Sequence, residues 1–359
     1  LGFGSGPCRL CRECNFDGCI RPDDARPSME ACGIDVYATG ALLHEMATGK
    51  LPFPGGTSAS VFEGILTKPP APAHGSTGWW RALSASWAPS PAASAFRPEM
   101  IGIPSGRATL GLLRGDASRF GWDNEYEQQE VEVPAFRIDR AMVTNGQFLA
   151  FIEASGYGRP DLWSAEDWRW RSERDIRHPA FWKREGGRWL WRGMFDDIPL
   201  PLDWPVYASH AEARAYARWA GKALPTEAQW HRAAYGMPDG SERQFPWGNE
   251  PPSPHRGNFD FERWDPVPVN AYPESRSAFG VEGLLGNGWE WTSSVFAPFP
   301  GFQSFSFYPG YSANFFDGKH FTMKGGSSRT AACMLRRSFR NWFQAHYQYT
   351  YAGFRCVSA

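Results

Sequence analysis

Aromatic side chains crowd one short segment in the C-terminal half of the chain, where together they could hold a positively charged group. A quaternary ammonium cannot donate hydrogen bonds, so aromatic faces are the natural way to bind it, at about 0.5–2 kcal/mol per well-placed ring. Long loops also need aromatic anchors when they bind no ligand, so a packing role for the same rings stays open. The segment covers residues 296–316 and contains Phe296, Phe299, Phe302, Phe305, Phe307, Tyr308, Tyr311, Phe315 and Phe316.

Cations without acidic neighbours follow this aromatic segment. From Lys319 to Ala359 the chain has five Arg and two Lys but no Asp or Glu. Such cations suit a carboxylate-bearing ligand, and the planar guanidinium is the better fork for a carboxylate. Arg336, Arg337 and Arg340 are therefore candidates for binding a small zwitterionic or carboxylate substrate. The same side chains could instead pair with Asp or Glu elsewhere in the chain.

A cluster of cysteines near the N-terminus could bind a metal. Cys8, Cys11, Cys14 and Cys19 follow a C-x2-C-x2-C-x4-C spacing, which is close to the bacterial ferredoxin run but not the same. The spacing predicts an iron–sulfur or zinc site, with unused thiols as the alternative. No signal peptide is visible, so we expect a reducing compartment, by default the cytoplasm.

The composition is typical of an ordinary soluble globular protein, with 42% hydrophobic and 21% charged residues. The formal net charge of −1 argues against a nucleic-acid partner. No run of apolar residues is long enough to span a membrane. Aromatic residues reach 16%, which predicts either an irregular fold held by large side chains or an aromatic-lined pocket.

Three capping boxes predict where helices begin in the C-terminal part of the chain. In each box a Ser or Thr is followed three residues later by Glu or Gln, and a Gly further on indicates the end of the helix. We expect short strands and long loops between these helices. The boxes are Thr144 with Gln147, Ser209 with Glu212, and Thr226 with Gln229.

Six ordered motifs carry a family resemblance over residues 98–359. They are VTNGQFLAFI (143–152), PVYASHAEARAYARWAGKALPTEAQWHRAA (205–234), FPWGNE (245–250), GLLGNGWEWTSS (283–294), KGGSSR (324–329) and AGFRC (352–356). In order and spacing they resemble the formylglycine-generating-enzyme, or sulfatase-modifying factor, family. The resemblance implies an α+β, C-type-lectin-like fold with two helices, small twisted sheets and much irregular loop. Gly288 stands where the family usually has an apolar residue, which predicts looser packing there.

Within this family the activity must be argued from site residues. The resemblance implies that formylglycine-generating enzymes bind copper with a Cys pair shortly after the GGS segment, whereas this chain has only Cys333 there. Sulfatase activation is therefore the weaker alternative. Three further segments are more similar to the sulfoxide synthases of ergothioneine and ovothiol biosynthesis. These enzymes join a thiol to N,N,N-trimethylhistidine with non-haem iron(II) and oxygen, and the segments are residues 120–138, 294–327 and 336–356.

The same resemblance implies roles for individual residues. Trp342 would lie beside the trimethylhistidine, and Tyr308 or Tyr311 would donate a proton or an electron facing the iron. One of the three arginines named above would meet the carboxylate of the thiol substrate. Phe343 stands where a subset of these enzymes has Asp, so γ-glutamylcysteine and cysteine both remain open as the thiol. The other substrate-binding candidates are Asn341, Phe302 and Phe316.

The resemblance implies three His ligands for iron from an N-terminal four-helix domain, two of them four residues apart. The eight His of this chain include no such pair. His320 and His346 lie near the pocket segments, but isolated His residues are more typical of hydrogen-bonded loops than of ligand sets. We therefore expect a missing region or a partner domain to supply the iron ligands. A non-catalytic C-type-lectin-like binding module, or a redox or regulatory protein using the Cys cluster, remains an alternative.

The first 97 residues differ in character from the rest. Residues 1–39 are Cys-rich and resemble a family of small predicted metal-binding proteins. Residues 40–72 carry a helical pattern, and residues 34–72 resemble a fragment of a protein kinase C-terminal lobe. The chain lacks the glycine loop, strand Lys, catalytic Asp and DFG of a kinase, so we expect no kinase activity. Residues 73–97 are typical of a linker, which completes a small irregular or helical N-terminal segment.

Overall fold

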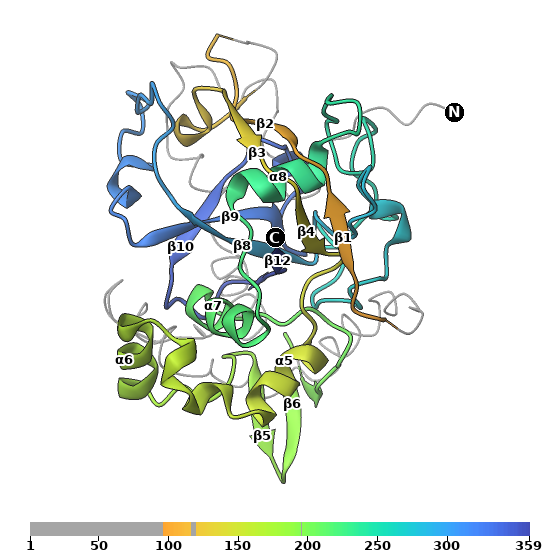
Figure 1. Cartoon of the computed structure of the whole chain (residues 1–359), viewed down its shortest axis with the longest axis vertical. Helices are drawn as coiled ribbons and strands as arrows, with labels where there is room; N and C mark the ends of the chain where they lie inside the picture. The colour runs from red at the N-terminus through yellow and green to blue at the C-terminus, as the bar shows by residue number, and fades with distance from the viewer. Residues whose placement is uncertain (1–95, 116–119, 195) are drawn as a thin grey trace, which may run out of the picture. The chain divides into compact units, whose positions relative to one another are not determined.

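The computed structural model describes residues 96–115, 120–194 and 196–359, which all belong to the second of two units, Ser90–Ala359. Figure 1 shows the course of this part of the chain. The Cys cluster, the kinase-like fragment and nearly all of the linker lie outside the described residues. Across the part of the chain that is described, no helix is long and apolar enough to cross a membrane.

Helices and small sheets are both present, which confirms the α+β expectation. The resemblance implied two helices, whereas the described residues contain four α-helices: α5 (Asn145–Glu153), α6 (Ala165–Glu173), α7 (His210–Trp219) and α8 (Glu227–Tyr235). Much of the remaining chain is loop with single 3-10 turns. These turns are η3 (Asp123–Glu125), η4 (Gly156–Gly158), η5 (Pro160–Leu162), η6 (Pro273–Ser275), η7 (Ala313–Phe315) and η8 (Ala332–Met334).

The strands form four small sheets. One sheet has the order β1-β4-β12, with β1 (Met100–Ile103), β4 (Phe136–Asp139) and β12 (Val357–Ser358). A second has the order β10-β9-β8-β11, with β10 (Asn341–Gln344), β9 (His320–Gly326), β8 (Gly288–Val295) and β11 (Ala352–Gly353). The other two are β2 (Gly106–Leu110) with β3 (Gln129–Val133), and β5 (Trp182–Glu185), β6 (Arg188–Arg192) and β7 (Asp197–Pro199). Neighbouring strands are antiparallel, except that β11 runs parallel to β8.

The three predicted helix starts are confirmed. The side chains of Thr144, Ser209 and Thr226 each accept a hydrogen bond from the backbone N–H three residues later, at the starts of α5, α7 and α8. Helix α6 was not predicted. Its N-cap is Ser164, whose side chain accepts a hydrogen bond from the backbone N–H of Asp167. The residue three positions after the cap is Asp, whereas a capping box has Glu or Gln there, so the sequence lacked this signal.

Many of the aromatic residues serve the core. The ring of Phe148 on α5 contacts the rings of five other aromatic residues, which include Tyr216 on α7 and Phe354 near the C-terminus. The looser packing expected at Gly288 does not occur. A Cβ at this buried position would stand 2.9 Å from a ring carbon of Tyr207, so the tyrosine ring fills the space that an apolar side chain would take.

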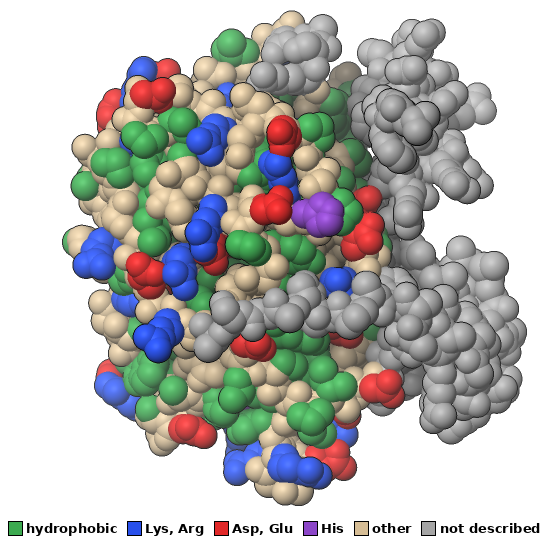
Figure 2. Space-filling view, turned by 90° about the vertical axis from the view of Figure 1, so that its right-hand side faces the viewer, with side chains coloured by type: hydrophobic (Ala, Val, Ile, Leu, Met, Phe, Trp, Pro, Cys, Tyr) green, Lys and Arg blue, Asp and Glu red, His purple; other side chains and the backbone are tan. Residues whose placement is uncertain are grey.

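The outer surface mixes charges of both signs. On the face seen in Figure 2, Lys and Arg side chains alternate with Asp and Glu across the described residues. This mixture agrees with the small net charge of the chain.

The sheet β10-β9-β8-β11 positions the segments that were predicted to carry the site (Figure 1). Strand β10 is an edge strand of this sheet and pairs with β9, so that Trp342 lies opposite Thr322 and Gln344 lies opposite His320. The aromatic segment 296–316 lies within the long connection from β8 to β9. A hydrogen bond from the N–H of Phe296 to the carbonyl of His320, at 2.8 Å, closes this connection.

Candidate functional site

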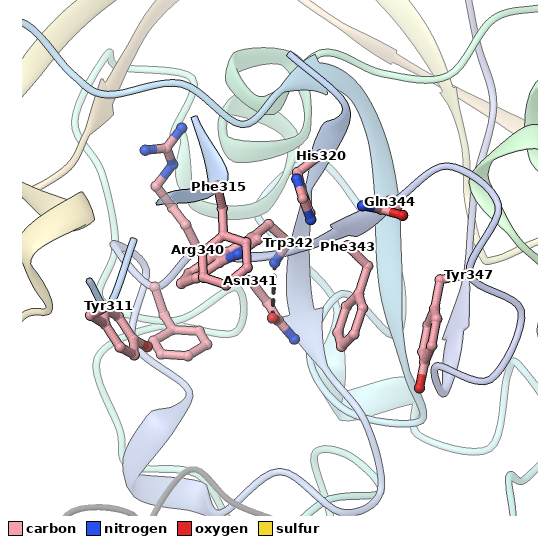
Figure 3. Close-up of a pocket in the computed structure, with 10 residues that line it drawn as sticks. Tyr311, Phe315, His320, Arg340, Asn341, Trp342, Phe343, Gln344 and Tyr347 are labelled. Carbon is pink, nitrogen blue, oxygen red and sulfur yellow. Dashed lines mark hydrogen bonds between the residues drawn. The ribbon is translucent and has the colours of Figure 1, made fainter. Parts of the chain in front are cut away.

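A pocket of about 380 Å³ lies along the edge strand β10. Figure 3 shows its side chains, which come from β10 and the residues flanking it, from the start of β9 and from the aromatic segment between β8 and β9. Because β10 is an edge strand, side chains from both of its faces reach the cavity. The lining residues are Tyr311, Phe315, His320, Phe339, Arg340, Asn341, Trp342, Phe343, Gln344 and Tyr347.

Trp342 is the centre of an aromatic wall. Its ring stacks on the fully buried ring of Phe296, with centroids 4.2 Å apart and planes within 6°. The ring centroid of Tyr311 lies 5.5 Å from that of Trp342, with an angle of 87° between the ring planes. For Phe315 and Trp342 the centroid distance is 5.5 Å and the interplanar angle is 49°. Trp122 backs Tyr311 at 4.3 Å. Three rings from two segments, the aromatic segment and β10, therefore line one cavity, an arrangement suited to the binding of a cation by aromatic faces.

The two tyrosines proposed as proton or electron donors differ in position. Tyr311 lines the pocket, whereas Tyr308 is 47% exposed and lies outside the lining. Burial raises the pKa of the Tyr311 phenol well above its usual value, and the nearby Glu125 carboxylate raises it further. Tyr311 therefore keeps its proton at neutral pH and can donate a hydrogen bond into the pocket.

Each of the three candidate arginines meets a carboxylate within the protein. Arg336 forks onto both carboxylate oxygens of Glu125. Arg337 donates to Glu242 at 2.9 Å. Arg340 donates through Nε to Glu227 at 3.0 Å and is the member of this set that lines the pocket. The geometry fits the alternative in which these side chains pair internally, and a substrate role for them stays a prediction.

Arg340 belongs to a buried charge network beneath the pocket. Glu227 on α8 meets Arg340 and also lies 3.6 Å from the ammonium of Lys324. Burial alone would raise the pKa of the Glu227 carboxyl, but the two cations outweigh it and hold this pKa below its usual value. Burial lowers the pKa of Lys324 to about 8, against the stabilising effect of Glu227. The carboxylate is the shared counter-charge of two buried cations.

The remaining predicted residues lie at different depths. Asn341 lines the pocket, and its side-chain oxygen accepts a hydrogen bond of 2.8 Å from the N–H of Trp342 (Figure 3). Phe316 packs on Phe296 at 4.9 Å, and Phe302 packs edge-on against Phe316 at 5.0 Å. Phe302 and Phe316 therefore pack around Phe296 and do not line the pocket. Their role in substrate binding stays a prediction.

Several lining residues were not predicted as binding residues. Phe343 stacks on Tyr347 with centroids 4.9 Å apart and planes within 13° (Figure 3). In the sequence, Phe315 is one of nine aromatic residues of the aromatic segment, and His320 is an isolated histidine, which is more typical of a hydrogen-bonded loop residue. Gln344 was the one that a local signal could have found. It stands two residues after Trp342, and on a strand this spacing places both side chains on one face.

The described residues do not fit an iron site. Over residues 96–115, 120–194 and 196–359, no group of three or more His, Cys, Asp or Glu side chains is arranged to hold a metal ion. The two cysteines of this part of the chain are not a pair. Cys356 is fully buried, which raises its thiol pKa well above the usual value, and Cys333 is exposed. A copper-binding pair of the formylglycine-generating type is therefore not formed among these residues.

Comparison with protein-family models gives two matches. Residues 86–359 match the family described as sulfatase-modifying factor enzyme 1-like domain. Residues 1–48 match a family described as predicted metal-binding protein. The second match agrees with the resemblance of the Cys-rich N-terminus, whose structure lies outside the described residues.

Three known proteins are similar to parts of this chain. The hercynine oxygenase of Mycobacterium tuberculosis is 44% identical over 65% of this chain and 55% of its own length. Ergothioneine biosynthesis protein 1 of Schizosaccharomyces pombe is 31% identical over 66% of this chain and 27% of its own. Among solved structures, PvdO of Pseudomonas aeruginosa is 20% identical, with a TM-score of 0.48 over 75% of this chain and 99% of its own. The chain thus spans about half the length of the hercynine oxygenase that it matches.

Proposed function

Since this chain belongs to the sulfatase-modifying factor enzyme 1-like domain family, we propose that residues 98–359 form the substrate-binding and catalytic domain of a sulfoxide synthase. Its substrate is hercynine, the N,N,N-trimethylated histidine. A C–S bond forms as the thiol S–H and an imidazole C–H are lost, and O2, the oxidant, supplies the sulfoxide oxygen and leaves as one water. The 44% identity to a hercynine oxygenase supports this assignment over sulfatase activation. Because the described residues contain no group of three side chains arranged to hold a metal, we propose that another region or a partner domain completes the iron site.

The aromatic wall carries the proposal. The ring centroids of Tyr311 and Phe315 each lie 5.5 Å from that of Trp342, and the lining contains no Asp or Glu. A primary ammonium in this pocket would lose its hydrogen bonds to water without a carboxylate to replace them. A trimethylated ammonium has no such hydrogen bonds to lose and gains the attraction of each ring face. The pocket is therefore suited to the methylated rather than the plain amino acid.

The chain's own residues supply positioning and a proton. Tyr311 holds a phenolic proton beside the ammonium-binding wall, and the side-chain oxygen of Asn341 accepts a hydrogen bond from the backbone N–H of Trp342. On the other side of β10, the Phe343–Tyr347 pair offers no carboxylate to an amino group. Cysteine and γ-glutamylcysteine each carry one free amino group, so this feature does not separate them, and we propose both as thiol substrates to be tested.

Calorimetric titration of the full chain with trimethylhistidine tests the binding step. We expect binding of trimethylhistidine and at least tenfold weaker binding of plain histidine, since aromatic rings discriminate by roughly 0.5–2 kcal/mol each. Trp342→Leu removes the central ring and should weaken trimethylhistidine binding by about tenfold, with no change for plain histidine. Equal affinity for the two amino acids would contradict the proposal.

A non-catalytic binding module is the second candidate function. The absence of a metal-binding group among the described residues favours it. It predicts that the full chain, given iron(II), oxygen, trimethylhistidine and cysteine together with the four-helix domain of a hercynine oxygenase, forms no sulfoxide. Detection of the sulfoxide by mass spectrometry would exclude this candidate.

A further inference from the structure

His320 is a lining residue whose ring is oriented by a carboxylate. Its Nδ1 lies 2.9 Å from Oδ1 of Asp317, and the His320 side chain is 10% exposed. The hydrogen bond lowers the pKa of the Asp317 carboxyl, which therefore stays charged and acts as the acceptor. From this bond we assign the ring hydrogen to Nδ1, which leaves the lone pair on Nε2. Asp317 thus makes His320 a hydrogen-bond acceptor at its far end.

The register of the sheet places this acceptor beside the aromatic wall. His320 lies directly opposite Gln344 across the β9–β10 pair, and Trp342 shares the face of Gln344. Phe315 connects the two, because its ring lies 5.2 Å from that of His320 and 5.5 Å from that of Trp342. Figure 3 shows the His320 ring among the pocket side chains. The acceptor is therefore one aromatic ring away from the place proposed for the ammonium.

Gln344 in the lining has an amide that can donate as well as accept, and three other polar groups are engaged or hold a proton for donation. The Arg340 guanidinium donates to Glu227, and the Asn341 oxygen accepts from the N–H of Trp342. Tyr311 holds its proton for donation. Among the described residues, Nε2 of His320 has no hydrogen-bond partner, although a bound ligand with an N–H group would supply one.

We propose that Nε2 of His320 accepts a hydrogen bond from the imidazole N–H of a trimethylated histidine whose ammonium lies against Trp342, Tyr311 and Phe315. This inference rests on the proposed function and deepens it. The ligand class it defines has a quaternary ammonium at one end and an aromatic N–H donor one methylene away from the ammonium-bearing carbon. His320 is then the residue that selects the ring, while the aromatic wall selects the methylated ammonium.

Calorimetry of the full chain with two ligands separates these roles. Trimethylhistidine carries the N–H, and trimethylphenylalanine carries the same ammonium and a ring without an N–H. His320→Phe should weaken trimethylhistidine binding by about tenfold, which is the net effect of one hydrogen bond, and leave trimethylphenylalanine within about twofold of wild type. His320→Gln keeps an acceptor and should recover part of the loss. Asp317→Asn, at an exposed position, should lose affinity in the same direction by loosening the ring.

The outcomes distinguish the two proposals. If wild type binds trimethylhistidine and His320→Phe binds it equally well, the role of His320 is overturned and the proposed function stands. If His320→Phe loses both ligands alike, the residue acts on the pocket as a whole and the inference is also overturned. If wild type shows no preference for trimethylhistidine over plain histidine, the proposed function fails and the inference fails with it. Should His320→Phe not fold, the Asp317→Asn titration decides.

Discussion

At the scale of single residues, the pocket depends on charges that never face solvent. Glu227 is fully enclosed with Arg340 and Lys324, and Arg340 is also covered by the ring of Phe299, whose centroid lies 4.0 Å from its guanidinium carbon. Removing one partner of a buried charge network leaves the others unpaired, which is more harmful than replacing the whole network. Glu227 therefore determines the position of Arg340 and, through the chain, of Trp342 two residues later.

Replacement of Glu227 by Gln should show this dependence. We expect Glu227→Gln to lower the free energy of unfolding by about 3–5 kcal/mol, because two buried cations lose their counter-charge. The matched control is Glu130→Gln, which breaks the Arg107–Glu130 pair of 2.9 Å, where both side chains are more than half exposed. That change should lie within about 0.5 kcal/mol of wild type by urea denaturation. Similar losses for the two variants would refute the assigned role.

At the scale of elements, a buried carboxylate links helix α6 to other parts of the domain. Asp167 on α6 accepts hydrogen bonds from Arg214 on α7 and from Nε2 of His346, which follows β10, at 2.9 Å for the histidine. The ring of His346 also stacks on that of Trp170, with centroids 4.6 Å apart and an angle of 2° between the ring planes. Burial would raise the pKa of Asp167, but the hydrogen bond from His346 and the charge of Arg214 outweigh it and lower this pKa to about 2.

This depressed pKa predicts how the anchorage responds to acid. A carboxyl whose pKa is lower in the folded than in the unfolded protein stabilises the fold above its unfolded value, near pH 4. The stabilisation is lost as pH falls toward 2. Asp167→Asn removes the titrating group, so its unfolding free energy should fall less steeply than that of wild type between pH 5 and pH 3. Guanidinium denaturation at several pH values measures the two slopes, and parallel slopes would show that Asp167 is not the group responsible.

Local signals predicted some elements and not others. The capping boxes at Thr144, Ser209 and Thr226 predicted the starts of α5, α7 and α8, because a capping box is formed by residues that are close together in the sequence. Helix α6 lacks that signal, and its charged sequence, AEDWRWRSE, shows no clear apolar stripe. Its place in the fold depends on Arg214 and His346, which are distant in the sequence and leave no local pattern.

Some residues of the candidate site could be predicted from local motifs, and others could not. Trp342, Asn341 and Tyr311 were predicted from motifs, and the structure brings them to one pocket. The place of His320 follows from the β9–β10 register, and the internal partners of the arginines follow from contacts across more than ninety residues. Neither the register nor these long-range pairings can be deduced from spacing along the chain, so the sequence left internal pairing of the arginines open as an alternative but could not identify the partners.

At the scale of the whole domain, one buried arginine joins segments that are far apart in the sequence. Arg355 is fully buried and forks onto both oxygens of Glu290 on β8, at 2.6 Å each. Its guanidinium also donates to the carbonyls of Asp139 and Arg140, at 3.1 Å, and of Glu282, at 3.0 Å. The same Glu290 accepts from the indole N–H of Trp230 on α8. The first sheet, the site-bearing sheet and α8 therefore meet at a single ion pair.

Because these elements meet at one ion pair, we expect the domain to unfold as one cooperative unit. Weakening the ion pair should lower the free energy of unfolding of the whole domain. Lys cannot reproduce the planar fork of Arg, so Arg355→Lys should lose several donors at once and lower the free energy of unfolding by about 3–5 kcal/mol. Tryptophan fluorescence and far-UV circular dichroism should shift together in denaturant. Arg276→Lys is the control, since Arg276 pairs with Glu282 but is 57% exposed and should change stability by no more than about 0.5 kcal/mol. If the two signals of Arg355→Lys separated instead, the sheets would be independent in stability, and the pocket on β10 would owe nothing to this junction.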